Sequence, residues 1–167
     1  MVKTLRQHCF TNEKGEDIWL FTLSNALGTE VLITNYGAII TSFKIKMPDG
    51  HFNDIVLGFD EIRDYQGKVY LDGYPWFGAA VGRYANRIKD ASFEIDGKRF
   101  YLSKNRGNDQ LHGGVSGFDK KVWHFVASGS SPYPYLQLRY VSADGEEGFP
   151  GKLTVNIRFE LDNENQL

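Results

Sequence analysis

The chain has 167 residues, of which 41% are hydrophobic and 24% are charged, and its net charge is −2 with a pI near 6.1. These values are ordinary for one globular domain with a hydrophobic core. A surface for nucleic acid or an anionic membrane normally carries a basic stripe, and no run of Lys and Arg here exceeds two residues, so we expect neither partner.

The single cysteine, Cys9, excludes an internal disulfide and a cysteine-based metal cluster. Residues 1–19 contain neither an apolar h-region nor a small-residue cleavage site, so we expect no signal peptide. No apolar run reaches the length of a membrane span. The sequence therefore favours a cytoplasmic protein.

The first part of the chain predicts short strands joined by tight turns. Residues 17–25 and 29–35 form a predicted hairpin around Leu27-Gly28, and a third strand over 38–46 ends at a Pro-Asp-Gly turn. Residues 53–59 predict a short buried strand. The following segment, 60–73, is polar and Tyr-rich, and it predicts irregular structure with one helical turn near its start.

The second part continues this pattern. Residues 92–102 predict the clearest hairpin, because apolar residues alternate on both sides of Asp96-Gly97, a type I′ turn signal. Three more strands are predicted at the spacing typical of a sandwich, over 122–129, 135–142 and 152–161. No window shows a 3.6-residue apolar period, so we predict an all-β, antiparallel β-sandwich. Residues 162–167 are read either as a turn entering another strand or as a frayed end.

Candidate ligand-binding residues lie at the two ends of a predicted short β segment. His112 precedes Gly113 and Gly114, which tolerate positive φ and let the backbone approach a ligand. Such a histidine either donates a hydrogen bond to a sugar oxygen or is satisfied by local backbone. Arg87 either forks onto adjacent hydroxyls or forms a structural ion pair, and Asn86 either binds ligand or forms a turn. Together these residues suit a neutral, hydroxyl-rich ligand.

Other polar groups are interpreted as structural. No histidine pair has metal-ligand spacing and no acidic cluster matches a calcium loop, so we expect no metal site. The acidic residues of SADGEEGFPG predict a solvated loop rather than an acid/base pair. The residues so interpreted are His8, His51, His124, Asp144, Glu146 and Glu147.

Several stretches resemble the aldose 1-epimerase (galactose mutarotase) family, whose members interconvert the α and β anomers of galactose, glucose and related aldoses. They occur in family order over almost the whole chain, and their combination is far more specific than any single one. The stretches are NYGAII, DIVLGFD, YPWFGAAVGRYANRI, LHGGVSGFDKKVW and DGEEGFPGKLTV.

The resemblance implies a large galactose mutarotase-like β-sandwich (supersandwich) and no metal or organic cofactor. It assigns Asn86 and Arg87 to substrate hydroxyls, and His112 to the first active-site histidine, which supports catalysis by holding the sugar. In the implied mechanism, a Glu takes the proton of the anomeric hydroxyl and a His protonates the ring oxygen. The ring then opens, the C1–C2 bond rotates, and the ring closes from its other face.

The sequence also departs from the family. Family members carry the second histidine, in a motif like N-H-S-Y-F-N, and the catalytic Glu beyond the DGEEGFPG region, and 1–167 contains no counterpart of either. Glu160 and Glu164 lie in the wrong motif to replace that Glu. Asn108-Asp109-Gln110 and Trp76 also differ from the family pattern, at what we expect to be the rim of the site.

We therefore expect 1–167 to form a single, truncated mutarotase-like sandwich domain, incomplete at its C-terminus and corresponding to the N-terminal portion of the family. Its exposed sheet edges predict self-association. The alternatives are a non-catalytic carbohydrate-binding module, an inactive remnant, and an enzyme acting on hexose 6-phosphates. The last would need a basic phosphate pocket, which the scattered Lys and Arg residues do not favour.

Overall fold

The computed structural model describes residues 3–73 and 75–167. A five-stranded antiparallel sheet comes first, and its strands are hydrogen-bonded in sequence order. The strands are β1 (Lys3–Thr11), β2 (Asp17–Ser24), β3 (Glu30–Thr34), β4 (Ile40–Lys46) and β5 (Phe52–Asp54).

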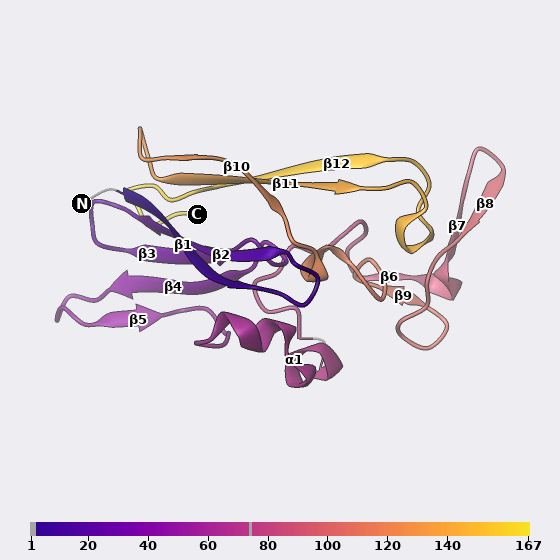
Figure 1. Ribbon diagram of the computed structural model, residues 1–167, viewed down its shortest axis with the longest axis horizontal. Coiled ribbons are helices and arrows are strands. Elements are labelled where there is room, and N and C mark those ends of the chain that lie inside the picture. The colour runs from indigo at the N-terminus through magenta and orange to yellow at the C-terminus, as the bar shows by residue number, and fades with distance from the viewer. Residues whose placement is uncertain (1–2, 74) are drawn as a thin grey trace.

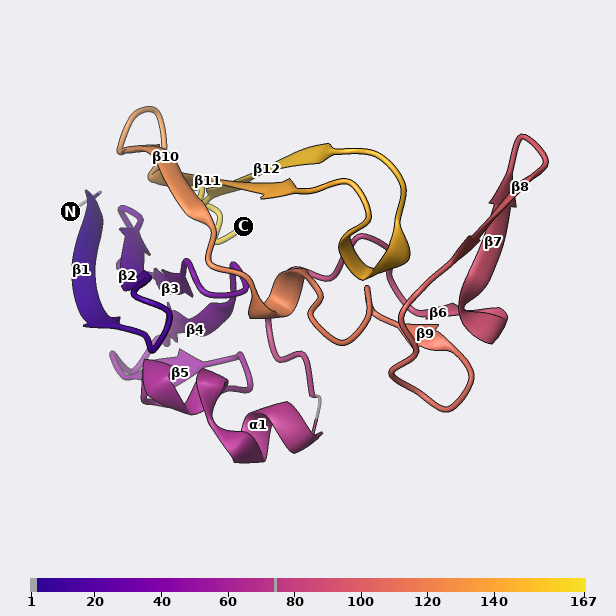
Figure 2. The same cartoon turned by 45° about the vertical axis from the view of Figure 1, so that its right-hand side comes forward.

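A three-stranded antiparallel sheet lies over the first one, as Figures 1 and 2 show. It consists of β10 (His124–Gly129), β11 (Tyr135–Ser142) and β12 (Leu153–Glu160). Two small ribbons, β6–β9 and β7–β8, lie beyond one end of these sheets. Their strands are β6 (Arg87–Ile88), β7 (Ser92–Ile95), β8 (Lys98–Tyr101) and β9 (Gln110–Leu111).

The helical segments are short. The longest is α1 (Lys68–Gly73), which Figure 1 shows below the first sheet. The 3₁₀ turns are η1 (Ile62–Gln66), η2 (Lys89–Ala91), η3 (Phe118–Lys120) and η4 (Glu146–Gly148). Within the described residues, no helix is long and apolar enough to cross a membrane.

The main core lies between the two large sheets. Alternate residues of β2 and β3 face alternate residues of β11, because successive side chains in a strand point to opposite faces. Trp123, just before β10, is 1% exposed and closes one end of this core. The fully buried side chains of this core are Phe21, Leu23, Val31, Ile33, Leu136, Leu138 and Leu161. The predicted antiparallel sandwich is confirmed.

The predicted hairpins are also confirmed. β2 pairs with β3 from Leu20–Thr34 to Ser24–Glu30. β7 pairs with β8 around Asp96 and Gly97, whose φ angles of 50° and 74° match the type I′ turn that Asp-Gly favours.

Two expectations for the first half need correction, and one strand lies where the sequence predicted none. The predicted strand over 53–59 ends at Asp54, because its carboxylate accepts hydrogen bonds from the Phe43 and Val56 amides and the Ser42 hydroxyl, which turns the chain out of the sheet. The segment 60–73 holds a 3₁₀ turn and a short α-helix instead of one helical turn. The edge strand β1 has no sequence prediction, since most of its side chains are exposed on both faces.

Residues 162–166 form an ordered turn, so the frayed-end interpretation is wrong for them. The backbone amide of Asp162 donates to the backbone carbonyl of Gln166 at 3.0 Å. The Asp162 carboxylate accepts hydrogen bonds from the backbone amides of Glu164 and Gln166. The side-chain amide of the buried Asn25 donates to the backbone carbonyl of Asp162 at 2.7 Å and to the side-chain oxygen of Asn165 at 2.9 Å. This turn is thereby anchored to the β2–β3 turn.

Candidate functional site

The β6–β9 ribbon brings the predicted site residues together. Arg87 pairs with Leu111, and Ile88 pairs with Gln110. Just beyond this ladder, the Asn86 carbonyl accepts the His112 amide at 3.0 Å. The two motifs that the sequence placed at separate strand ends therefore lie side by side.

His112 lies in a tight turn. The Gly114 amide donates to the Leu111 carbonyl at 3.1 Å, and both central residues of the turn have positive φ, 51° at His112 and 89° at Gly113. Gly113 is required, because a Cβ there would overlap the carbonyl oxygen of Gly82. The histidine is thus held where two backbone segments touch.

The His112 imidazole has a defined tautomer. Its Nδ1 lies 3.0 Å from the backbone amide nitrogen of Asn86. Because a backbone amide can only donate, Nδ1 is the acceptor and the proton of the imidazole lies on Nε2. Burial lowers the pKa of this imidazole below its ordinary value, the opposing charge of Asp119 raises it in part, and Arg87 lowers it further. His112 is therefore neutral at pH 7 and keeps an Nε2–H donor.

Arg87 and Asn86 are exposed beside this histidine. Arg87 Nη1 lies 3.4 Å from Asn86 Oδ1, a long hydrogen bond, and no carboxylate of the described residues forms an ion pair with Arg87. Within the described residues, the ion-pair alternative for Arg87 therefore finds no partner. Asn86 has φ 66°, as a turn former does, and its side-chain oxygen faces the guanidinium.

Two further residues lie near His112: Trp76, which we expected at the rim of the site, and Asp119, which the sequence analysis did not single out. The Trp76 ring lies 4.6 Å from the His112 ring, centroid to centroid, at an angle of 59°. Asp119 is 2% exposed, and one of its oxygens lies 2.6 Å from Lys120 Nζ. Burial raises the pKa of the Asp119 carboxyl, and Lys120 opposes that rise. Asp119 lies in GFDKKVW, part of a stretch that resembles the family, but that resemblance did not indicate that Asp119 lies near His112.

The acidic loop after β11 is not the solvated loop that its composition predicts. Glu146 accepts hydrogen bonds from Tyr140 and Lys121, both at 2.6 Å, and from Ser142. Glu147 accepts the backbone amides of the loop that follows His112. Gly and Pro flanks suggested exposure, but here they bend the loop so that its carboxylates point inward; Asp144 is exposed as expected.

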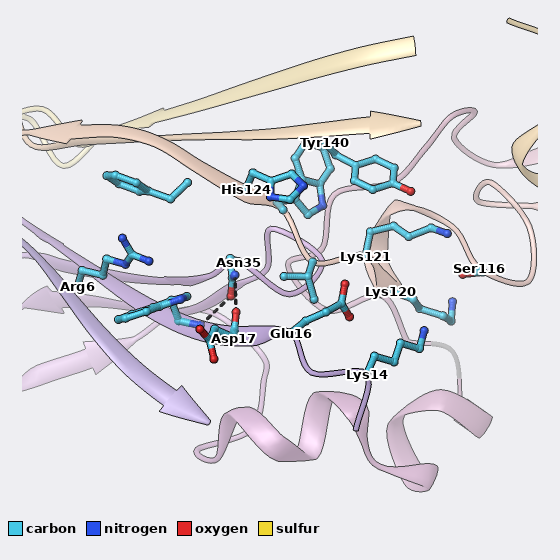
Figure 3. A pocket seen from close by; sticks show the side chains of 14 residues that line it. Arg6, Lys14, Glu16, Asp17, Asn35, Ser116, Lys120, Lys121, His124 and Tyr140 are labelled. Carbon is cyan, nitrogen blue, oxygen red and sulfur yellow. Dashed lines mark hydrogen bonds between the residues drawn. The ribbon is translucent and has the colours of Figure 1, made fainter. Parts of the chain in front are cut away.

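A hollow of about 550 Å³ lies elsewhere, between β1–β2 and β10–β11 (Figure 3). Its charged side chains are largely engaged. Asp17 accepts from Thr11 and His8, and Lys120 and Lys121 each pair with a carboxylate at 2.6 Å. The guanidinium of Arg6, which also lines the hollow, lies 3.7 Å from the centroid of the Trp19 ring. His124, expected to be partly buried, is exposed at its wall.

Metal binding finds no support within the described part of the chain. There, no group of three or more His, Cys, Asp and Glu side chains is placed to hold an ion. The chemistry available near His112 is hydrogen bonding by a neutral imidazole, a guanidinium and an amide.

The fold is that of the galactose mutarotase-like β-sandwich proteins. A galactose 1-epimerase from Lactobacillus acidophilus NCFM superposes with a TM-score of 0.84 at 30% identity, covering 99% of this chain and 46% of the other. The family model for aldose 1-epimerase matches residues 20–167. The chain belongs to the aldose 1-epimerase family.

Curated relatives agree with this assignment. Galactose mutarotase from Bos taurus is 43% identical over 132 residues, which cover 78% of this chain. Aldose 1-epimerase from Escherichia coli (strain K12) is 35% identical over 153 residues, which cover 92% of this chain. The chain spans only 35% and 42% of these relatives, in agreement with the expected correspondence to the N-terminal portion of the family.

We predict that His112 titrates with a midpoint below its ordinary value of about 6.5. Between that midpoint and pH 6.5 the unfolded chain binds more protons, so the free energy of unfolding falls as the pH drops below 6.5 and gains nothing above it. NMR of the His112 Cε1–H resonance measures the midpoint. His112→Asn keeps an acceptor near the Asn86 amide but does not titrate, so this part of the pH dependence should vanish; a wild-type midpoint at or above 6.5 would contradict the argument.

Proposed function

We propose that this chain supplies the sugar-holding part of an aldose 1-epimerase active site, with Asn86, Arg87 and His112 binding the oxygens of galactose, glucose or a related aldose. The observation that carries the proposal is the junction at the end of the β6–β9 ribbon. There a neutral imidazole with an Nε2–H donor lies beside a guanidinium that no described carboxylate neutralises. Donors of this kind suit the acceptor lone pairs of a polyol.

The chemical role of His112 follows from its tautomer. Its Nε2–H donates to a sugar oxygen and thereby orients the ring, while Nδ1 is occupied by the Asn86 amide and takes no proton from the substrate. Proton transfer at the anomeric hydroxyl and the ring oxygen belongs, in the mechanism implied by the family, to a Glu and a second His that 1–167 does not contain.

We further propose that 1–167 forms one domain corresponding to the N-terminal portion of the relatives. Its small-molecule partner is an aldohexose, as the names of the mutarotase relatives suggest for those proteins. The lone Cys9, partly exposed and without a disulfide partner, supports a cytoplasmic location.

Sugar binding is tested by titrating D-galactose into the labelled chain and following its amide resonances. We expect saturable shifts at residues 86–87 and 111–114, and about tenfold or more weaker binding in Arg87→Ala, because a charged donor to a hydroxyl is lost. Arg139→Ala is the matched control, since Arg139 is exposed on β11 and donates to Asn156 instead. Saturable shifts that are the same in both variants would rule out this site.

Mutarotation is tested by polarimetry on freshly dissolved α-D-galactose. We expect the 167-residue chain alone to accelerate the change in rotation little or not at all, since loss of a general acid or base typically costs about 10²–10⁴-fold. A rate near that of a full-length relative assayed alongside would contradict the assignment of His112 to a supporting role.

Self-association is proposed at the free edge of β12. Among the described residues, this eight-residue strand pairs with β11 alone, and its inward side chains Val155, Ile157 and Phe159 remain partly exposed. By contrast, β1 and β10 approach each other, and the Thr4 hydroxyl donates to the Gly129 carbonyl at 2.7 Å. An unpaired strand edge next to half-covered apolar side chains recruits further strands.

Sedimentation velocity over a range of concentrations tests this edge. We expect oligomers whose proportion grows with concentration, and a shift towards monomer in Leu153→Lys, which places a charge at the start of β12 where the side chain is 40% exposed. Leu5→Lys, on β1 where the side chain is 51% exposed, is the control and should leave association unchanged. A wild-type chain that stays monomeric at every concentration would refute the proposal.

A further inference from the structure

The Glu147 side chain crosses from the η4 loop to the loop that follows His112. Its Oε2 accepts the Val115 amide at 2.9 Å, and its Oε1 accepts the Ser116 amide at 2.9 Å. The Ser103 hydroxyl donates to the same carboxylate. Glu147 therefore binds two successive backbone amides, which lie three and four residues after His112.

The Glu147 backbone is tied to the same region. Its carbonyl accepts the Ser103 amide at 3.1 Å and the Gln110 side-chain amide at 3.2 Å. Gln110 is 1% exposed, so this position, where the sequence departs from the family pattern, lies beneath the loop and not at the rim of the site. The geometry of Glu147 is thus fixed from both its main chain and its side chain.

Asn105 holds the opposite side of the His112 turn. Its side-chain amide donates to the backbone carbonyls of Leu111 and Gly114, both at 2.9 Å. Its side-chain oxygen accepts a hydrogen bond from the backbone amide of Leu111 at 2.6 Å. Asn105 thereby fixes the two ends of the turn, whereas Glu147 fixes the chain that leaves it. With both in place, the backbone that carries the imidazole is fixed before any ligand binds.

The Glu147 carboxylate also explains why residue 114 is a glycine. A Cβ at this position would collide with Glu147 Oε2 and the Ser103 hydroxyl, and φ there is 105°. Only glycine leaves room for the carboxylate against the turn. Charge-assisted hydrogen bonds to two amides are stronger than neutral ones, so a carboxylate holds this loop better than an amide would.

We propose that Glu147 is a positioning residue for sugar binding: its carboxylate fixes the loop after His112 and so sets the direction of the His112 Nε2–H donor. Glu147 does not touch the ligand. It acts by lowering the conformational freedom of the turn that carries the imidazole, which is the usual contribution of residues that support a binding group. This inference rests on the proposed sugar site.

The test compares Glu147→Gln with Glu146→Gln. A Gln at 147 keeps the size of the side chain but turns a donor towards one of the two amides, so we expect faster hydrogen exchange at Val115 and Ser116, a displaced His112 Cε1–H resonance and about tenfold weaker D-galactose binding. Glu146→Gln makes the same chemical change in the adjacent residue, which contacts Tyr140 and Lys121 instead. It should leave all three measurements at their wild-type values.

The outcomes distinguish failure of the positioning role of Glu147 from failure of the proposed sugar binding. A Glu147→Gln chain with wild-type galactose affinity and an unmoved His112 resonance would overturn the positioning role. If wild type itself does not bind galactose, the proposed function fails, yet the His112 resonance and the two exchange rates still decide whether Glu147 orients this turn. Should Glu147→Gln unfold, Ser103→Ala removes one donor to the carboxylate and should show the same changes to a smaller degree.

Discussion

The contact between Gly113 and the Gly82 carbonyl is the constraint on which the site depends. Two backbone segments touch there without room for a side chain, so the His112 turn lies directly against the start of the GRYANR motif. The same carbonyl accepts the Phe118 amide at 3.2 Å, which joins η3 to the junction. Arg83, the next residue, then donates to the Ser142 hydroxyl at 2.8 Å and to the Pro150 carbonyl at 3.1 Å. One close backbone contact thus organises three motifs.

Much of the fold could be predicted because local signals agreed with tertiary ones. Alternating apolar residues in β2, β3 and β11 face the core, and the Asp96-Gly97 turn adopts the positive φ angles that its residues permit. The neighbourhood of Arg87 and His112 could also be predicted, since both lie beside turn signals at strand ends. Family likeness then supplied what local patterns lack, namely the roles of these side chains.

The remaining features depend on contacts between distant residues. β1 is an edge strand with little burial, so it has no apolar period to read. Asp54 ends a strand through a side chain that bonds back across the sheet, which no window of sequence reveals. Glu147 looks like a loop carboxylate because its partners lie more than thirty residues away. Composition describes such a loop correctly as polar, but it cannot say what the polar groups bind.

The linkage of Arg83, Glu147 and the glycines of the His112 turn also bears on how the site could be moved. If only the LHGG turn were grafted onto another sandwich, the backbone amides of Val115 and Ser116 would lose the Glu147 carboxylate that accepts from them. Gly113 would also lose its close contact with the Gly82 carbonyl. The smallest transferable unit is therefore discontinuous. It comprises the GRYANR segment, the stretch from Ser103 to Ser116, and the acidic loop after β11, and any natural exchange of this site between proteins would have to carry all three together.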